Sequence, residues 1–176
     1  SIITTMSYTT VPENTIVFRP AAKEDVARCA ELEAAGYPSD EAASPESLAF
    51  RQANAPDYFL VATKNDDEIV GFVCGTLTAS SDLTHESMSE HESAGTLLCI
   101  HSVCVDEAYR RKKIATRALK AYLTCVSQIN SQITEVRLIC KEKLIPLYEG
   151  AGFRLLGASS IQHGKDQWFE CLYTFD

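Results

Sequence analysis

The chain lacks any apolar run close to the ~20 residues that a membrane-spanning helix needs, and no signal-peptide pattern opens it. It also lacks C-x-x-C pairs and the ligand spacing of zinc sites, although seven cysteines are scattered along its 176 residues. We therefore expect a cytoplasmic protein with reduced, partly buried thiols, no membrane attachment and no bound metal.

Positive charge is scarce except in one place. Lysine and arginine number 16 against 24 aspartates and glutamates, so the formal net charge is −8. Four basic residues nevertheless stand together at 110–113. An acidic protein with one local basic cluster suits an anionic cofactor at the cluster and cationic substrates elsewhere, and we expect no nucleic-acid partner.

The apolar fraction of 45% is ordinary for a globular protein, and the chain is long enough to bury a core of its own. We predict a flexible tail over 1–14, which is rich in Ser and Thr, and a single domain over 15–176. Hydrophobic periodicity and turn residues predict the elements. Strands are expected at 15–20, 58–64, 69–78, 97–105, 135–140, 153–160 and 167–175, and helices at 22–36, 45–53, 114–126 and 144–151.

The order of these elements predicts one mixed sheet. The strand–helix–strand unit over 97–140 requires a parallel pair of strands, whereas the hairpins over 58–78 and 153–175 require antiparallel pairs. We therefore predict an α/β (α+β) fold of about seven strands with helices on both faces. Gly71 and Gly75 allow a bulge or a close packing contact within one strand.

The segment 97–122 changes its pattern twice. An apolar, β-branched run at 97–105 is typical of a strand buried on both faces, and a basic turn at 110–113 follows. Apolar residues then recur at helical spacing from Ile114. Backbone N–H groups at the start of such a helix, together with the helix dipole, form an anion site. The pattern therefore predicts a phosphate-binding turn.

Two titratable side chains stand out by their positions. Glu33 continues an apolar stripe with Val26 and Cys29 at helical spacing, so it is either a flanking residue that reaches solvent or an acid that faces a cleft. His101 lies inside the strand 97–105. It is either a hydrogen-bonded core residue or a base with an intrinsic pKa suited to neutral pH.

Three stretches of the sequence resemble the Gcn5-related N-acetyltransferase superfamily, and within it the arylalkylamine (serotonin) N-acetyltransferase family, in particular its fungal polyamine-acetylating branch. The first is LTHESMSEHESAG at 83–95, followed by IHSVCVDEAYRRKKIATRAL. The second is LICKEKLIPLYEGAGF at 138–153, and the third is GKDQWFECLYTF near the carboxyl end. The likeness extends over residues 16–175.

The resemblance implies acetyl-CoA as the co-substrate. The superfamily's loop reads Arg/Gln-x-x-Gly-x-Gly/Ala, and here Lys113 stands at the middle glycine. Glycine allows the backbone to approach the pyrophosphate closely, so a lysine fits there if its backbone is helical and its side chain points to solvent or to a phosphate. By resemblance, the cofactor contacts are Val103, Cys104, Val105, Arg110, Arg111, Lys112, Lys113, Ile114, Ala115, Thr116 and Tyr148.

The resemblance also assigns catalytic roles. A primary amine with a pKa near ~10.4 is mostly protonated at neutral pH, so it must lose a proton before it attacks. Tyr148 matches the family's acid for the departing thiolate. Two residues compete as the base: Glu33 matches the first-helix acid of insect members, and His101 matches the second histidine of a His-x-His pair whose first position is here Cys99. We expect His101 to share a strand face with Val103.

The implied reaction is direct transfer of acetyl from acetyl-CoA to a small arylalkylamine or polyamine in a ternary complex, by a monomer. Two alternatives stay open, namely a protein-lysine or histone acetyltransferase and a non-catalytic acetyl-CoA-binding module. Acidic loop residues favour an acceptor with several ammonium groups, unless they are simply solvated surface. These residues are Asp40, Glu41, Glu86, Glu90 and Glu92.

Overall fold

The structure is a computed structural model that describes residues 15–110 and 113–176. The predicted tail over 1–14 therefore lies outside the described residues. The helices are α1 Val26–Gly36, α2 Pro45–Asn54, α3 Ile114–Ile129 and α4 Ile145–Gly150. The strands are β1 Val17–Pro20, β2 Phe59–Lys64, β3 Glu68–Thr78, β4 Leu97–Val105, β5 Glu135–Cys140, β6 Arg154–Ala158 and β7 Phe169–Thr174.

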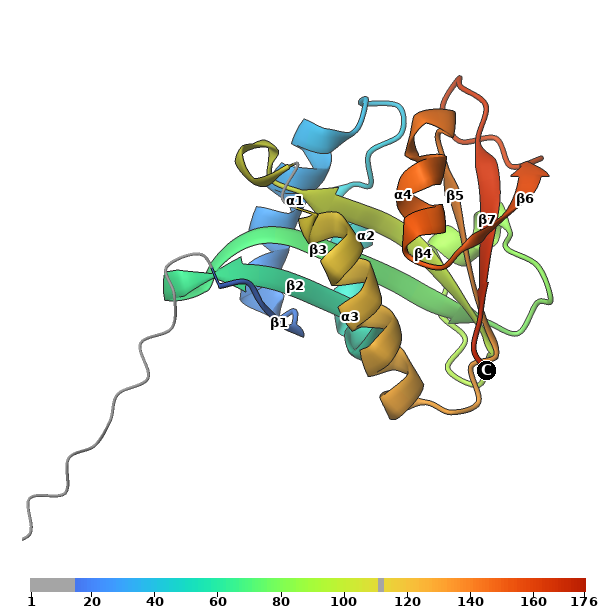
Figure 1. Ribbon diagram of the computed structural model, residues 1–176, viewed down its shortest axis with the longest axis horizontal. Coiled ribbons are helices and arrows are strands. Elements are labelled where there is room, and N and C mark those ends of the chain that lie inside the picture. The colour runs from blue at the N-terminus through green and yellow to red at the C-terminus, as the bar shows by residue number, and fades with distance from the viewer. Residues whose placement is uncertain (1–14, 111–112) are drawn as a thin grey trace, which may run out of the picture.

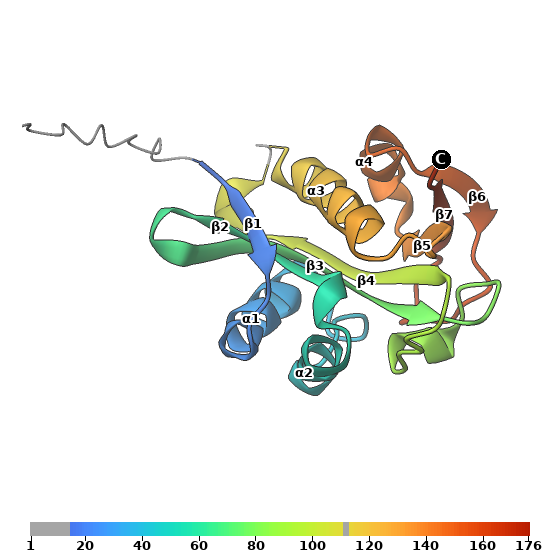
Figure 2. The ribbon, with the colours of Figure 1, turned by 90° about the horizontal axis from the view of Figure 1, so that it is seen from below.

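All seven strands join one mixed sheet in the order β1-β2-β3-β4-β5-β7-β6 (Figure 1). β4 and β5 pair in parallel, and the other neighbours pair antiparallel. Figure 2 shows α1 and α2 beneath one face of the sheet and α3 and α4 on the other. The predicted fold class, the parallel pair and the helices on both faces are thus confirmed. No helix within the described residues is long and apolar enough to cross a membrane.

Each face of the sheet has its own apolar core. On the α3 side, Leu119, Tyr122 and Val126 pack against the sheet at the spacing of one helix face. The fully buried Tyr122 donates its hydroxyl to the carbonyl of Tyr58 at 2.8 Å, so its polar tip is satisfied. On the opposite side, Cys29 of α1 and Leu48 of α2 pack against β2 and β3.

A bulge in β4 re-aims the side chain of His101. Cys74 pairs with Ser102 and Gly75 pairs with Ile100, so His101 is an extra residue in the ladder. As predicted, Gly75 allows this close packing: a Cβ there would lie 2.5 Å from the carbonyl oxygen of Cys99. The bulge turns both His101 and Ser102 toward the α1 and α2 side, where they bond Thr76 and Glu33.

The expectation that His101 shares a strand face with Val103 is therefore wrong. Val103 and Val105 pack against the apolar clusters that include Tyr148 and Ile114, on the α3 side. Simple alternation along the strand would give His101 the same direction, but one inserted residue reverses it.

The pairing of β4 with β5 ends early. It covers only Leu97–Cys99 opposite Glu135–Arg137, although β4 continues to Val105 and β5 to Cys140. The edge of β4 beyond Cys99 thus has no neighbouring strand on that side among the described residues. Two cavities meet at this opening in the sheet.

Candidate active site

Two cavities meet beside β4, and three residues, Tyr37, Val103 and Tyr148, line both. We call the first the histidine cavity because His85, His101 and His163 line it; its volume is about 370 Å³. We call the second the basic cavity because Arg110, Lys113 and Lys143 line it; its volume is about 520 Å³.

Tyr148 stands on α4, a short helix that begins with a proline in its first turn. Its ring packs edge-on against Phe153, and the residue is only 4% exposed. Burial raises the pKa of the Tyr148 phenol, and the neighbouring thiols, Cys140 foremost, raise it further. The phenol therefore keeps its proton and can donate it to a group that becomes basic beside it.

Glu33 lies on α1 and is 2% exposed, so of the two interpretations of its position the acid that faces a cleft is confirmed and the flanking residue that reaches solvent is wrong. Its Oε1 accepts hydrogen bonds from the amide of Ala43 at 2.9 Å and the hydroxyl of Ser102 at 3.1 Å. Its Oε2 accepts from the thiol of Cys104 at 3.0 Å. Burial and this carboxylate raise the pKa of Cys104, so the thiol keeps the proton that it donates.

His101 is held by a chain of hydrogen bonds that fixes its tautomer. Its Nε2 lies 2.7 Å from the hydroxyl oxygen of Thr76, and that hydroxyl donates to the carbonyl of Ser87 at 2.7 Å. The Thr76 oxygen must then accept from Nε2–H, which leaves Nδ1 as the acceptor nitrogen. Burial, and next the positive charge of Arg51, lower the pKa of His101 well below its usual value.

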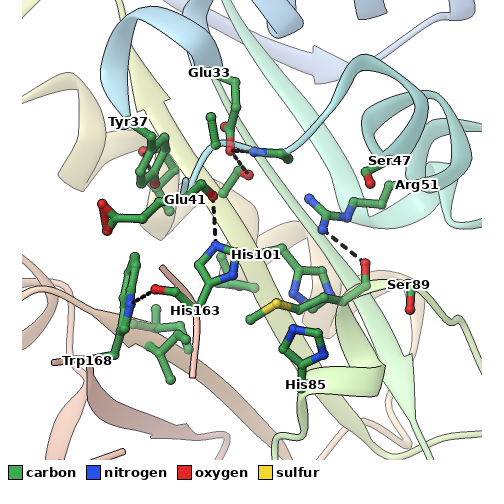
Figure 3. Close-up of a pocket in the computed structure, with 18 of the residues that line it drawn as sticks. Glu33, Tyr37, Glu41, Ser47, Arg51, His85, Ser89, His101, His163 and Trp168 are labelled. Atoms are coloured by element: carbon green, nitrogen blue, oxygen red, sulfur yellow. Dashed lines mark hydrogen bonds between the residues drawn. The ribbon is translucent and has the colours of Figure 1, made fainter. Parts of the chain in front are cut away.

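The two predicted bases therefore line one cavity in forms that can accept a proton (Figure 3). Cys99, which occupies the first position of the family's His-x-His pair, is fully buried and paired with Thr76 of β3. Burial raises the pKa of its thiol to about 12, so it stays protonated.

A contact between two loops closes one side of the histidine cavity. The Nε2 atom of His163 lies 2.7 Å from the carbonyl oxygen of Glu41, and the carboxylate of Glu41 pairs with Lys141 at 2.6 Å. The rings of Trp168 and His163 are tilted at 57° to each other with centroids 5.4 Å apart, and the ammonium of Lys141 lies over the Trp168 ring. Figure 3 shows Glu41, His163 and Trp168 together on one side of the cavity.

Contrary to the prediction, the acidic loop residues do not gather around this cavity. Glu41 alone of the five lines it, and its charge is matched by Lys141. The carboxylate of Asp40 accepts a hydrogen bond from the amide of Lys165, and the carboxylate of Glu92 accepts one from the hydroxyl of Thr78. The sequence argument for an acceptor with several ammonium groups is correspondingly weaker.

The basic cavity contains the cofactor residues predicted from the sequence, except that Arg111 and Lys112 lie outside the described residues. Lining residues that were missed are Gly36, Tyr37, Tyr109, Lys143, Leu144 and Leu147. Tyr109 adjoins the basic turn, and the other five lie in two other segments, where they gave no local signal. Tyr37 also donates its hydroxyl to the carbonyl of Val103 at 3.3 Å, which ties the end of α1 to the open edge of β4.

The start of α3 faces the basic cavity with unpaired amides. The first backbone bond of this helix runs from the amide of Arg117 to the carbonyl of Lys113, and no side chain caps the helix. The amides of Ile114, Ala115 and Thr116 therefore lack an intrahelical acceptor, as at every helix start. These three amides, the helix dipole and the side chains of Arg110 and Lys113 together can bind an anion.

Lys113 does not have the right-handed helical backbone that the sequence argument required of it. Its φ of 57° and ψ of 24° place it in the left-handed region, where a side chain crowds the following carbonyl and glycine does not. The position thus keeps the backbone of a glycine while carrying a lysine.

Within the described residues, no group of three or more His, Cys, Asp or Glu side chains is arranged to hold a metal ion.

Comparison with known sequences gives one family match. The model of the acetyltransferase (GNAT) family matches residues 26–153. Serotonin N-acetyltransferase of Mesocricetus auratus is 27% identical over 107 residues, which are 60% of this chain and 50% of that protein. The Homo sapiens enzyme of the same name is 29% identical over 104 residues, or 58% and 49% of the two chains. The match thus spans about half the length of these relatives.

Solved structures share the fold at low sequence identity. GphF, a GNAT-like decarboxylase in complex with isobutyryl-CoA, superimposes with a TM-score of 0.78 at 18% identity, covering 90% of this chain and 98% of its own. The NatC complex bound to Gag peptide and CoA gives a TM-score of 0.73 at 16% identity, covering 92% and 99%. At these identities the likeness establishes the fold alone.

Proposed function

Because the chain belongs to the acetyltransferase (GNAT) family, we propose that it moves the acetyl group of acetyl-CoA to a primary amine of a small molecule. The observation that carries the proposal is that two cavities of different character share Tyr37, Val103 and Tyr148. In this proposal the basic cavity takes acetyl-CoA, the histidine cavity takes the amine, and the acetyl group passes between them at the shared wall. Direct transfer needs this proximity and no covalent enzyme intermediate.

The basic cavity suits acetyl-CoA chemically. The amides at the start of α3, with Arg110 and Lys113, match a pyrophosphate. The open edge of β4 at Val103 and Val105 offers backbone groups to the amides of a pantetheine arm, as an added strand would use them. Two of the similar structures contain CoA or an acyl-CoA, which supports the same co-substrate here.

The histidine cavity supplies candidates for the proton acceptor. An amine with a pKa near ~10.4 enters as an ammonium, so one residue or water must take a proton before the nitrogen attacks. Glu33 and the Nδ1 atom of His101 are both acceptors on this wall, and a water chain between them could serve either. We therefore keep both residues as the proposed bases.

Tyr148 is the proposed acid. The attack releases a thiolate, whose conjugate thiol has a pKa of about 8.5 in simple models. A buried phenol with a raised pKa holds its proton until that thiolate forms beside it. Its place on the wall between the two cavities suits this role.

The acceptor class proposed from the sequence is a small arylalkylamine or a polyamine. The aromatic side chains of Tyr37 and Trp168, with Leu83, Ile100 and Met88, suit an aryl group. The serotonin N-acetyltransferases that the chain resembles are named for such an amine.

A panel assay tests the proposal. Purified protein is mixed with acetyl-CoA and tryptamine, phenethylamine, putrescine or spermidine, and both thiol release and the acetylated amine are measured. We expect amine-dependent thiol release with an equal amount of N-acetyl product. Binding of acetyl-CoA without turnover of any primary amine would reduce the protein to a binding module. Acetylation of lysine peptides alone would reassign it as a protein acetyltransferase.

A further inference from the structure

Arg51 is a buried cation with no charge partner within residues 15–110 and 113–176. It lies on α2 and is 4% exposed. Its Nη2 donates to the carbonyl of Met88 at 3.0 Å, and its Nη1 lies 3.9 Å from the sulfur of Cys74, a weak acceptor. Its Nε has no hydrogen-bond partner among the described residues. Since a guanidinium carries five N–H donors, most of its capacity is unused.

Arg137 shows how this fold treats a comparable arginine. Its side chain is 16% exposed, and it forms ion pairs with Asp82, Glu135 and Glu170 at 3.2–3.3 Å. No carboxylate of the described residues pairs with Arg51. A charge removed from water without an opposite charge is strongly unfavourable, so an uncompensated guanidinium at a cavity wall indicates a partner that comes from outside the chain.

The surroundings of Arg51 favour an anion as that partner. Arg51, Ser47 and His85 line the histidine cavity, and Figure 3 shows them on one side of it with His101, away from Glu41 and Trp168. The two carboxylates that line the same cavity are already engaged. Glu33 accepts three hydrogen bonds, and Glu41 pairs with Lys141.

We propose that Arg51 binds a carboxylate of the amine acceptor, so that an acceptor with a carboxylate beside its primary amine, an amino acid-like molecule, is preferred over a plain amine or a polyamine. This inference rests on the proposed function. Arg51 is then a specificity-determining residue: its free Nε–H and Nη–H groups hold the carboxylate as a fork. The acceptor's amine lies toward Glu33, His101 and Tyr148 in the same cavity.

Matched acceptor pairs test the inference on the unaltered protein. L-Phenylalanine is compared with phenethylamine and L-tryptophan with tryptamine, since each pair differs only by the carboxylate. β-Alanine, γ-aminobutyrate and ε-aminocaproate are compared with alkylamines and diamines of the same carbon count. We expect kcat/KM to be about ten-fold or more higher for the carboxylate in at least one pair. Preference for the plain amine or the diamine in every pair would overturn the proposal.

Two variants separate recognition from folding. Arg51→Met removes the charge and keeps the side chain's bulk, whereas Arg51→Lys keeps the charge and loses the fork. We expect Arg51→Met to lower kcat/KM for the carboxylate member of each pair about ten-fold or more relative to its plain amine, so that the preference is lost. Arg51→Lys should keep part of the preference. Equal losses on all acceptors would show a structural role only.

The failure of this inference is distinct from the failure of the proposed function. Turnover of plain amines with no carboxylate preference refutes the role of Arg51 and leaves amine acetylation intact. If no acceptor is acetylated, calorimetric titration of the CoA-saturated protein with phenylalanine and phenethylamine still tests Arg51. Tighter binding of phenylalanine that is lost in Arg51→Met and kept in part in Arg51→Lys supports the carboxylate site, and equal or absent binding of both overturns it.

Discussion

The basic cavity and the histidine cavity are built in different ways. Most of the basic cavity comes from one continuous segment, 103–116, completed by α4 and the end of α1. The histidine cavity takes its wall from α1, α2, β4 and the loops before β4 and β7. The first offers mainly backbone groups, and the second offers side chains in fixed hydrogen-bond networks. Side-chain substitutions should therefore act most strongly in the histidine cavity, and backbone changes in the basic one.

Tyr148→Phe should give the largest effect, because Tyr148 belongs to both cavities. The variant keeps the ring that packs on Phe153 and removes only the proton donor. We expect kcat to fall about 10²-fold or more, with little change in the KM of acetyl-CoA. The control is Tyr122→Phe, which removes a buried hydroxyl that lines neither cavity and should cost about 1 kcal/mol of stability without a change in kcat. Equal kcat values for the two variants would contradict the assignment.

Substitution of the two proposed bases should have the next largest effect and should act on the amine side alone. We expect Glu33→Gln and His101→Ala each to lower kcat/KM for the amine by about 10- to 100-fold, most strongly below pH 8, where the ammonium form dominates. Dissociation of acetyl-CoA, measured by titration, should stay within about two-fold. If both variants keep the full wild-type pH profile, neither residue is the base.

The buried His101 should also make the stability of the protein depend on pH. Because its pKa in the folded protein is lowered, the unfolded chain binds the proton first as the pH falls below about 6.5. Stability is then lost with falling pH, by up to about 1.4 kcal/mol per pH unit for this one group, and is unaffected above that range. Urea unfolding at pH 8, 6.5 and 5 should show a shallower acid loss in His101→Gln than in the wild type. Parallel curves would mean that His101 is not held neutral.

The smallest effect should come from the backbone of the basic cavity. Lys113→Gly and Lys113→Ala both remove the charge, but glycine alone relieves the left-handed backbone. We expect the glycine variant to be about 1 kcal/mol more stable than the alanine variant, and to bind acetyl-CoA at least as tightly. A more stable alanine variant would show that the left-handed conformation carries no strain.

The difference between the two cavities, one built mostly from a continuous segment and one from distant segments, also explains how much of the structure the sequence could predict. The mixed sheet and the strand and helix on either side of the basic turn follow from periodicity and from residues close together in the chain, and the inward Glu33 is one of the two interpretations that periodicity allows. The direction of His101 does not, because one bulge residue reverses a strand's alternation. Arg51 stands on an ordinary helix with no local signal, and only the three-dimensional structure shows that it is buried beside His101 without a carboxylate.

The left-handed backbone of Lys113 is a second feature that the sequence could not predict. Sequence patterns identify the loop by its position between strand and helix, but a lysine there gives no sign of positive φ. The positions of the acidic loop side chains are a third such feature, because the number of charges along a chain does not tell which side chains reach a cavity. Glu41 reaches the histidine cavity, whereas the Glu92 carboxylate accepts hydrogen bonds from the Thr78 hydroxyl and the Ala79 amide at the end of β3.

Initial-rate kinetics with both substrates varied test the account most directly. The proposed transfer across the wall shared by the two cavities requires acetyl-CoA and the amine to be bound together. Double-reciprocal plots at several fixed amine concentrations should therefore intersect, and a non-reactive CoA analogue should compete with acetyl-CoA and not with the amine. Parallel lines, with release of CoA before the amine binds, would indicate an acetylated enzyme and contradict direct transfer between the two cavities.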